Sequence, residues 1–440
     1  MAGQTTGQDT GSGAVAPRRA ALHLLDQVLG ERRLLAELIA LPDGPLAAMQ
    51  PSARARAQRL ALTALRNIGR ADRLLGPHLR KRPPLPVHNI LRLALAEVLA
   101  EGEAAHGVVN SAVTIARSSP GTAAMAGLVN AVLRRCLEGA EGRWNELPVQ
   151  ELPKWLRRPL IDAYGKPAVQ GMERAHLAGA PLDLTLKQED HALTQALGAA
   201  TLPGGSLRLP ARVQVSDLPG YTGPDAGWWV QDAAAALPVR LLDPRPGERI
   251  ADLCAAPGGK TMQLAAAGAT VTAVDLSAQR MERVRENLRR TGLEADLVVA
   301  DATQWRPAAP LDAVVLDAPC SATGTIRRHP DLPFVKDGSE ISALVALQAR
   351  LLDHAVGLLR DGGRLVFCTC SLLPEEGEAQ ALAALKRHPG LQILPACADW
   401  IDPQWRSPEG GLRLRPDFWP DRGGMDGFYM VVMQWTPEAS

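Results

Sequence analysis

The chain has 440 residues, of which 46% are apolar and 4% aromatic, and its 48 basic and 47 acidic side chains almost cancel. So high an apolar content at so low a net charge excludes a wholly disordered chain, and the length predicts two to four domains. No apolar run approaches the roughly 18 to 20 residues of a membrane-spanning helix, and residues 1–13 lack the basic start and apolar core of a secretion signal. We therefore expect a soluble, cytoplasmic protein that does not contact a membrane.

The first third of the chain predicts a basic helical domain. Residues 1–15, rich in Gly, Thr and Gln, predict a disordered tail, and residues 16–145 carry apolar side chains at helical spacing, which indicates about five helices. Residues 50–92 hold ten basic side chains against one acidic residue, Asp72. This pattern is typical of a polyanion-binding surface, although a solvated helix face would have the same composition. The side chains expected to contact the polyanion are Arg54, Arg56, Arg59, Arg66 and Arg70.

Two further segments follow. Residues 146–225 are rich in Pro and Gly and contain short mixed runs at 182–186 and 207–215, which predict a small α+β connector. Residues 226–440 alternate strand-like apolar runs with helical patterns at 278–290 and 341–359, the order of a parallel, doubly wound α/β sheet. The predicted strands of this sheet are residues 249–253, 270–275, 295–300, 313–317 and 364–368.

The residues that follow the first three predicted strands suit an adenosine-containing cofactor. In an open α/β sheet, ligands bind beyond the carboxyl ends of the strands. The first strand leads into Asp252-Leu-Cys-Ala-Ala-Pro-Gly-Gly-Lys-Thr261, whose glycines let a ligand approach the backbone. The second ends at Asp275, a carboxylate able to accept hydrogen bonds from both ribose hydroxyls, and Arg280 lies on the helix that follows. The third ends at Asp301-Ala302, where an adenine edge would lie.

The same loop excludes two phosphate-binding alternatives. It lacks the Gly-x-Gly-x-x-Gly fingerprint that holds the pyrophosphate of NAD, and it has Ala255 where a Walker loop has its first glycine. An adenosine site without a phosphate-binding loop indicates S-adenosylmethionine.

Two cysteines follow neighbouring strands of the predicted sheet. The fourth strand leads into Leu316-Asp-Ala-Pro-Cys-Ser-Ala-Thr-Gly324 and the fifth into Phe367-Cys-Thr-Cys-Ser371, so adjacent parallel strands would bring Cys320 and Cys370 to one rim. We expect Cys368 and Cys370 to point to opposite faces of their strand. Since no Cys-x-x-Cys or His pair completes a tetrahedron, no metal site is predicted. Six cysteines in so long a chain do not form a disulfide framework, and a reducing compartment is expected.

Methylation of carbon 5 of a pyrimidine explains why two thiols would be needed. That carbon becomes nucleophilic when a thiolate adds at carbon 6, and covalent catalysis divides one difficult step into easier ones. A base must then remove the proton from carbon 5 so that the thiolate can leave. One cysteine would attack and the other would assist release, and the attacking thiol needs a pKa below its ordinary value of about 8.5.

These residues resemble the Sun-type (Fmu) family of RNA cytosine-5 methyltransferases over residues 16–435, and the stretch from Gly127 to Arg135 resembles the closing helix of the antitermination factor NusB. The motifs that carry the family resemblance are the loops quoted above, Arg327-Arg-His-Pro-Asp331, Pro374-Glu-Glu376 and Asp426-Gly-Phe428. The chain departs from the family pattern at Gly377, where many members have Asn, and at Leu184-Thr-Leu-Lys187, where an Arg-x-Asn element is usual.

The resemblance implies a NusB-like RNA-binding bundle, a connector and a Rossmann-like methyltransferase domain that binds S-adenosylmethionine and methylates small-subunit (16S) ribosomal RNA. It implies Cys370 as nucleophile and Cys320 as the release residue, with Asp317 on the amino edge of the cytosine and Lys260 in the same catalytic site. The cofactor-binding residues would be Cys254, Ala255, Ala256, Pro257, Gly258, Gly259, Lys260, Asp275, Arg280, Asp301, Ala302 and Asp317. Further RNA contacts would be Arg327, Arg328 and His329, for which surface salt bridges are the alternative.

We therefore expect a monomeric, cytoplasmic, metal-independent RNA (cytosine-5-)-methyltransferase with ribosomal RNA as its partner. Two alternatives stay open: the same chemistry on transfer RNA, and a noncatalytic RNA-binding factor that keeps the fold as a scaffold. The presence of Cys370 and of the aspartates after the strands favours the enzyme.

Overall fold

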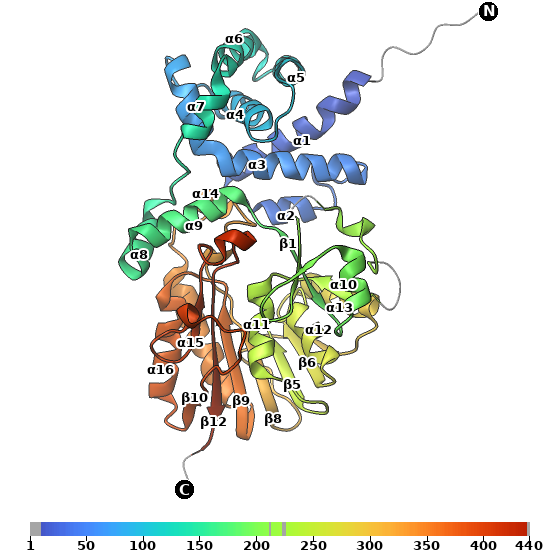
Figure 1. Ribbon diagram of the computed structural model, residues 1–440, viewed down its shortest axis with the longest axis vertical. Coiled ribbons are helices and arrows are strands. Elements are labelled where there is room, and N and C mark those ends of the chain that lie inside the picture. Colours follow the sequence, from blue (N-terminus) through green and yellow to red (C-terminus); the bar gives the residue numbers. More distant parts are fainter. Residues whose placement is uncertain (1–9, 211–212, 222–225, 438–440) are drawn as a thin grey trace, which may run out of the picture. The chain divides into compact units, whose positions relative to one another are not determined.

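The computed structural model describes residues 10–210, 213–221 and 226–437 (Figure 1). They divide into two compact units: a helical unit, which runs to Arg157 and includes Arg328–Asp337, and a sheet unit, which contains Arg158–Arg327 and the chain from Gly338 onward. Across the described ranges, no helix combines the length and the apolar character needed to cross a membrane. Of the predicted tail, residues 1–9 lie outside the described residues, and the following residues already belong to a helix.

The helical unit is built from more helices than the five expected from the sequence. Proline stands in the first turn of three of them, where its missing N–H is not needed. The apolar faces of these helices enclose one core that includes Leu24, Leu65 and Leu91. The helices are α1 (Thr10–Glu31), α2 (Leu35–Ala40), α3 (Pro51–Leu75), α4 (Leu85–Leu99), α5 (Ala105–Arg117), α6 (Ala126–Leu137), α7 (Ala140–Glu146) and α14 (Leu332–Val335), with short 3-10 turns at Gly76–His78 and Ala123–Met125.

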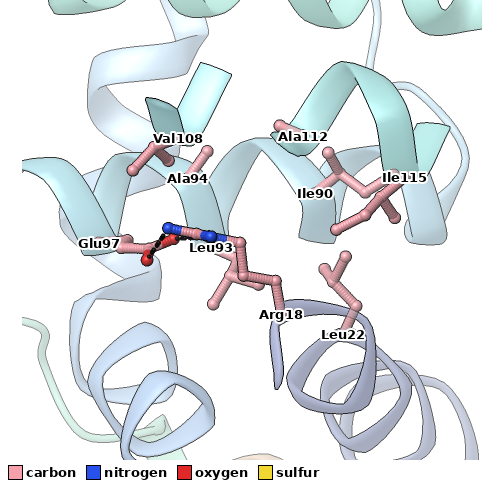
Figure 2. A pocket seen from close by; sticks show the side chains of 9 residues that line it. All are labelled: Arg18, Leu22, Ile90, Leu93, Ala94, Glu97, Val108, Ala112 and Ile115. Atoms are coloured by element: carbon pink, nitrogen blue, oxygen red, sulfur yellow. Dashed lines mark hydrogen bonds and ion pairs between the residues drawn. The ribbon is translucent and has the colours of Figure 1, made fainter. Parts of the chain in front are cut away.

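An ion pair is buried between α1 and α4 of this unit. Arg18 donates to both carboxylate oxygens of Glu97, at 2.8 and 2.6 Å, and Glu97 is 1% exposed (Figure 2). Apolar side chains such as Leu22 and Ile90 surround the pair, so its two charges are shielded from water and compensate each other.

Residues 328–337 lie within the range predicted for the sheet domain, but they belong to the helical unit. The backbone N–H of Leu35 donates to the carboxylate of Asp331 at 2.9 Å, and Phe334 and Val335 of α14 pack against the helical core. Within the predicted range 226–440, residues 328–337 are therefore built into the helical core rather than the sheet unit.

The sheet unit begins with two helices and a small antiparallel sheet of order β2-β3-β1-β4. Of the two runs predicted here, 182–186 is a strand; within 207–215, residues 207–209 form a strand, and residues 211–212 lie outside the described residues. The elements are α8 (Lys154–Tyr164), which contains the point of division, α9 (Lys166–Ala178), β1 (Leu182–Leu186), α10 (His191–Leu197), β2 (Ala200–Thr201), β3 (Leu207–Leu209), a 3-10 turn at Val215–Asp217 and β4 (Trp228–Val230).

The main sheet has the order β10-β12-β9-β8-β5-β6-β7, with β11 paired to β12. Neighbouring strands from β9 to β7 are parallel, as predicted, whereas β12 pairs antiparallel with β9, β10 and β11. The prediction of a wholly parallel sheet is therefore wrong at this edge. The strands are β5 (Arg249–Leu253), β6 (Thr270–Asp275), β7 (Asp296–Val299), β8 (Leu311–Asp317), β9 (Leu359–Thr369), β10 (Leu391–Ile393), β11 (Leu412–Leu414) and β12 (Phe428–Trp435).

Helices cover both faces of the main sheet, because successive strand residues point to opposite faces. Val314 and Leu316 of β8 pack in the cluster that contains Leu352 of α15, whereas Val315 packs in the cluster that contains Val239 of α11. The covering helices are α11 (Ala233–Leu242), α12 (Gly259–Ala266), α13 (Ala278–Thr291), α15 (Ile341–Val356) and α16 (Glu378–Arg387), and 3-10 turns lie at Thr323–Thr325, Pro374–Glu376, Pro403–Trp405 and Pro420–Arg422.

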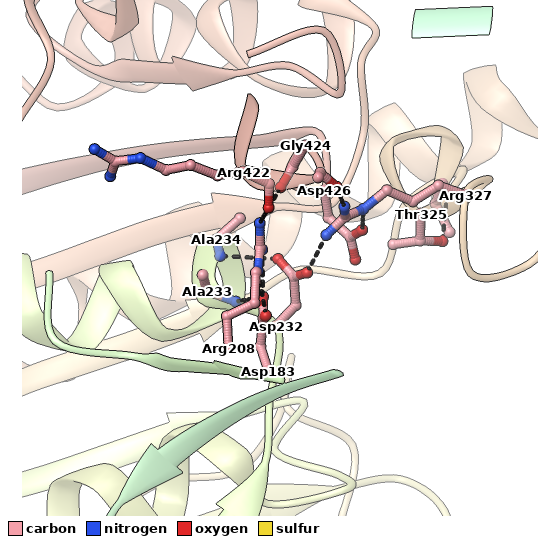
Figure 3. Close-up of polar contacts among 12 residues, drawn as sticks. Asp183, Arg208, Asp232, Ala233, Ala234, Thr325, Arg327, Arg422, Gly424 and Asp426 are labelled. Atoms are coloured by element: carbon pink, nitrogen blue, oxygen red, sulfur yellow. Dashed lines mark hydrogen bonds and ion pairs between the residues drawn. The ribbon is translucent and has the colours of Figure 1, made fainter. Parts of the chain in front are cut away.

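A buried ionic network ties the segment after β8 to the segment before β12 (Figure 3). The Arg327 guanidinium is 0% exposed; it donates to Asp232 at 2.7 Å, to Asp426 at 2.5 Å and to the Gly423 carbonyl at 2.9 Å. Asp232 also caps α11 by accepting from the Ala234 N–H. The prediction that Arg327 contacts RNA is wrong in this structure, because burial leaves its side chain inaccessible.

The Arg327 network should dominate the stability of this part of the sheet unit. Arg327→Met leaves two buried carboxylates without this counter-ion, which typically costs about 3–5 kcal/mol. We expect urea unfolding of the full chain to show a loss of that order in the transition of the sheet unit. The matched control is Arg422→Met, since the exposed Arg422 side chain points away from the network (Figure 3) and lies over the Trp419 ring. Equal losses in the two variants would contradict the account.

Candidate active site

The loop after β5 is joined to the end of β6 by hydrogen bonds. Asp275, 2% exposed, accepts from the backbone N–H groups of Ala256 and Ser277 at 3.1 and 3.0 Å. The Arg280 guanidinium donates to the Ala256 carbonyl at 2.6 Å and lies 3.5 Å from the Asp275 carboxylate. The structure therefore brings Asp275, Arg280 and the loop into one cluster, and the assignment of this cluster to the adenosine end of a cofactor stays a prediction.

The backbone of this loop uses left-handed conformations. Cys254 and Gly258 have φ values of 61° and 98°, and the Ala256–Pro257 peptide bond is cis. A side chain at Gly258 would be strained, and its Cβ would lie 2.9 Å from the Val284 side chain on α13. The glycine therefore lets α13 approach the loop closely.

The rim beyond β6 and β7 presents one apolar and one acidic side chain to solvent. Leu276 is 75% exposed, which is unusual for a large apolar residue directly after a buried strand. Asp301 is exposed and accepts from the N–H and hydroxyl of Thr303, and these hydrogen bonds lower the pKa of its carboxyl. Ala302 beside it is buried. Sequence reasoning missed Leu276, although an apolar residue next to the strand-end acid was a usable signal.

Lys260 and Asp317 form an ion pair between α12 and the end of β8. Their side chains lie 2.6 Å apart, the Lys260 ammonium is 5.2 Å from the centre of the Phe428 ring, and Cys368 Sγ lies 3.7 Å from the other Asp317 oxygen. Burial is the largest single influence on the pKa of Lys260 and would lower it. The charge of Asp317, the hydrogen bond to Asp317 and the charges of Cys368 and Asp252 together outweigh burial and raise that pKa. The lysine is therefore a fixed cation that holds the Asp317 carboxylate in one orientation.

Cys320 and Cys370, the thiol pair, come together where β8 and β9 end. Their sulfur atoms are 3.5 Å apart within hydrogen-bonding range, and both side chains are half-buried. The hydrogen bond with Cys370, followed by burial, raises the pKa of Cys320 well above its ordinary value. Sequence reasoning thus correctly brought these two cysteines to one rim.

The other two cysteines of the site are poorly suited to nucleophilic attack. Burial, with a smaller contribution from the charge of Asp317, raises the pKa of Cys254 to about 12 and that of Cys368 well above its ordinary value. Cys368 and Cys370 both pack against one apolar cluster. The prediction that they point to opposite faces is wrong, because residues two apart in a strand share a face. Within the described parts of the chain, no group of three or more His, Cys, Asp or Glu side chains is arranged to hold a metal ion.

The backbone around the thiol pair is packed too tightly for side chains. The Gly324 N–H donates to the Cys370 carbonyl at 2.9 Å, and the Gly427 N–H donates to the Gly324 carbonyl at 2.8 Å. A Cβ at Gly324 would lie 2.0 Å from the Gly427 carbonyl oxygen. The three motifs that contain Cys320, Cys370 and Asp426 therefore meet through their backbones.

A buried polar cluster lies behind the thiol pair, and sequence reasoning missed it as a unit. The usable signal was the dipeptide Cys-Ser, which occurs after both β8 and β9. The cluster is made of Ser321, Thr323, Gln348, Ser371 and Glu376.

The structure does not gather the five predicted arginines of the helical unit into one open patch. Arg56 lies 3.2 and 3.3 Å from Glu97 and Glu103, and Arg59 lies 3.5 Å from Glu101. Arg70 is buried against the Trp144 ring, whereas burial lowers the pKa of Arg66 to about 10 and Arg54 is half-exposed.

Several basic side chains of the helical unit, Arg59 among them, are open to solvent. Arg328 is half-buried, and His329 is exposed. The exposed basic residues of the segment 50–92 are Arg59, Arg73, Arg80, Lys81 and Arg82.

Comparison with known proteins gives matches over both units. The family of 16S rRNA methyltransferase RsmB/F matches residues 239–434, and the NusB family matches residues 15–138. The ribosomal RNA small subunit methyltransferase B of Vibrio vulnificus is 33% identical over 94% of this chain and 98% of its own length. The protein of the same name from Pseudomonas syringae is 38% identical over 70% of this chain and 72% of its own length.

Solved structures share the fold. The crystal structure of PH0851 superposes with a TM-score of 0.71 at 22% identity and covers 95% of this chain and 98% of its own. NSun6 from Pyrococcus horikoshii, solved with SFG, superposes with a TM-score of 0.52 at 19% identity over 65% of this chain and 99% of its own. Since the Vibrio relative aligns along nearly the whole of both chains, this chain belongs to the RsmB/F family of 16S rRNA methyltransferases, with a NusB-family domain at its amino-terminal side.

Proposed function

We propose that this protein transfers a methyl group from S-adenosylmethionine to carbon 5 of a cytosine in 16S ribosomal RNA, through a covalent bond between Cys370 and the base. One observation carries the proposal: two half-buried thiols 3.5 Å apart at the ends of adjacent parallel strands, beside a lysine-held carboxylate. The named activity of the relatives supports ribosomal RNA as the substrate.

The cluster after β5 and β6 fits S-adenosylmethionine. An adenosine needs an apolar surface for its base and a carboxylate for its ribose, and the exposed Leu276 lies directly after the Asp275 carboxylate. The related fold of NSun6 was solved with SFG, an analogue of this cofactor. When bound, the cofactor supplies an electrophilic methyl group on a sulfonium. Residues 254–260 would line its methionine part, and Arg280, Asp301 and Ala302 would flank its adenosine end.

The residues of the chain would divide the remaining work. The Cys370 thiolate adds to carbon 6 of the cytosine, which makes carbon 5 nucleophilic. Asp317, held by Lys260, accepts a hydrogen bond from the amino edge of the base and fixes its orientation. After carbon 5 has taken the methyl group, Cys320, as its thiolate, removes the proton from carbon 5. The double bond between carbons 5 and 6 re-forms, and the Cys370 thiolate leaves. A thiol of raised pKa is a strong proton acceptor once it has ionised.

The target cytosine has to leave its stack to reach both the thiol pair and the methyl donor. The exposed basic residues of the helical unit supply contacts with RNA phosphates in this proposal, because phosphate contacts position an RNA without reading its sequence.

The cofactor assignment is tested by Asp275→Asn, which keeps the size of the side chain and removes its charge. A hydrogen bond to a charged acceptor contributes about 1.5–3 kcal/mol, so affinity for S-adenosylhomocysteine should fall roughly tenfold or more in a calorimetric titration. Asp296→Asn, on the exposed side of β7, is the control and should bind normally. Unchanged affinity of Asp275→Asn would place the ribose elsewhere.

The division of labour between the thiols is tested with the two alanine variants and methyl-labelled cofactor. Cys370→Ala should retain cofactor binding but form neither product nor adduct, because nothing activates carbon 5. Cys320→Ala should attack and methylate but fail to release, so a denaturant-stable protein–RNA adduct that carries the label should accumulate. An adduct with Cys370→Ala and none with Cys320→Ala would reverse the two roles.

The role of the helical unit in RNA binding is tested by neutralising Arg80, Lys81 and Arg82 together to Gln in the full chain. Each lost phosphate contact lowers the slope of log affinity against log salt by about 0.7–0.9, so the slope should fall by up to about 2–3. Lys386→Gln, an exposed substitution on α16, should leave the slope unchanged. An unaltered slope in the triple variant would make these residues a solvated surface.

A further inference from the structure

A single buried carboxylate lies behind both thiols of the active site. Glu376, in the 3-10 turn Pro374–Glu376, is 0% exposed, and its two oxygens accept hydrogen bonds from the segments that follow both Cys320 and Cys370. We infer that Glu376 is a positioning residue that holds the Cys320 thiol against the Cys370 thiol, so that release of the methylated base stays coupled to attack. The inference rests on the proposed roles of the two cysteines.

On the Cys320 side, Glu376 fixes the loop through three contacts. Its Oε1 accepts from the backbone N–H of Ser321 at 2.9 Å, and its Oε2 accepts from the Ser321 hydroxyl. Gln348 donates to Glu376 at 3.1 Å and to the Pro319 carbonyl at 2.8 Å. The residues on either side of Cys320 are therefore tied to one carboxylate.

On the Cys370 side, the same residue again reaches both neighbours of the cysteine. The Ser371 hydroxyl donates to Glu376 Oε2 at 2.6 Å, and the Thr369 hydroxyl donates to the Glu376 backbone carbonyl at 3.0 Å. The hydroxyls of Ser321 and Ser371 are also 3.1 Å apart. One carboxylate thus links two loops that are 50 residues apart in the chain.

The two cysteines depend on this link to different degrees. Cys370 directly follows β9, whose last residue, Thr369, is paired with Tyr429 of β12. Cys320 lies in a loop beyond the end of β8 and has no strand partner to fix it. Loss of the carboxylate should therefore displace Cys320 more than Cys370, and release should suffer more than attack.

The charge of Glu376 acts on the same thiol. The hydrogen bond with Cys370 and burial are the two largest causes of the raised pKa of Cys320. The negative charges of Cys370 and Glu376 raise that pKa further. A carboxylate here would thus both place Cys320 and keep it a strong proton acceptor once it has ionised.

The test measures how attacked RNA partitions between adduct and released product. Wild type, Glu376→Gln and Glu376→Ala are mixed with 16S ribosomal RNA and methyl-labelled S-adenosylmethionine for a single turnover, and labelled RNA is separated into protein-bound and free fractions under denaturing conditions. Only molecules that have completed attack and methyl transfer are counted, so a loss of folded enzyme does not change the ratio. The control is Glu375→Gln, the exposed neighbouring glutamate.

A positioned general base contributes roughly 100- to 10,000-fold, so a misplaced one should raise the ratio of adduct to product by at least about tenfold in Glu376→Gln. A larger rise is expected in Glu376→Ala, which also loses the contact with the Ser321 N–H, and none in Glu375→Gln. If Glu376→Ala does not fold, Glu376→Gln decides, because its amide can still accept from that N–H.

Three outcomes would overturn the inference: a wild-type ratio in the Glu376 variants that fold, a folded Glu376→Gln that yields neither adduct nor product, or an equal rise in Glu375→Gln. Cys320→Ala separates this failure from failure of the proposed function. If Cys320→Ala accumulates adduct and Glu376→Gln does not, only the positioning role fails. If Cys320→Ala also forms no adduct, the assigned role of Cys320 fails with it.

Discussion

The pairing of β8 with β9 is the constraint on which the candidate active site depends. In this parallel pair Leu316 lies opposite Phe367 and Asp317 lies opposite Cys368. The segments that follow β8 and β9 therefore leave the sheet side by side. Because side chains alternate with a period of two, a shift of β8 by one residue along β9 would turn Asp317 to the wrong face. The register is held by apolar packing on both sides of the sheet, where Leu316 and Val315 enter different clusters. The 3.5 Å separation of the thiol pair is the local result of this pairing.

Sheet pairing alone does not place the loops to which the proposed chemistry is assigned. Buried ions and tight backbone contacts complete their placement: Lys260 fixes Asp317, Glu376 joins the loops of Cys320 and Cys370, and Arg327 anchors the segment before β12. Each charge is paired or hydrogen-bonded inside the protein, as burial requires. The placement of these loops therefore depends on electrostatic contacts, which lie just beyond the ends of well-packed apolar strands.

The sequence was sufficient to predict the parallel strands and the approach of the two cysteines of the thiol pair. Strands β5 and β6 occur at the predicted residues, since their apolar runs are bounded by turn signals. The antiparallel strands beyond β9 were not predicted. Strands β10 and β11 carry too few residues for a clear period, whereas the apolar run of the eight-residue β12 was a usable signal. Arg327 was misassigned for a related reason: a motif shows that an arginine is present, but its counter-ions, Asp232 and Asp426, come from distant segments.

In the helical unit, too, the pairing of charged side chains was not visible in the sequence. Composition showed an excess of basic residues at 50–92, but Arg92 is buried on Asp72 and Arg56 and Arg59 lie close to glutamates of the same unit. Part of the predicted polyanion-binding surface thus forms internal ion pairs. The basic residues of this segment that stay exposed lie mainly at residues 80–82. Side-chain pairing of this kind depends on tertiary structure, and a count of charged residues along the sequence carries no information about it.

The central claim is that Cys370 forms the covalent bond to the cytosine. The most direct test uses 16S ribosomal RNA that contains 5-fluorocytidine, because fluorine replaces the proton whose removal would release the enzyme. Wild-type protein should become trapped after methyl transfer, and mass spectrometry of the digested adduct should find the modified nucleotide on the peptide that contains Cys370. A nucleotide on Cys320, or methylation without any trapped protein, would contradict the account.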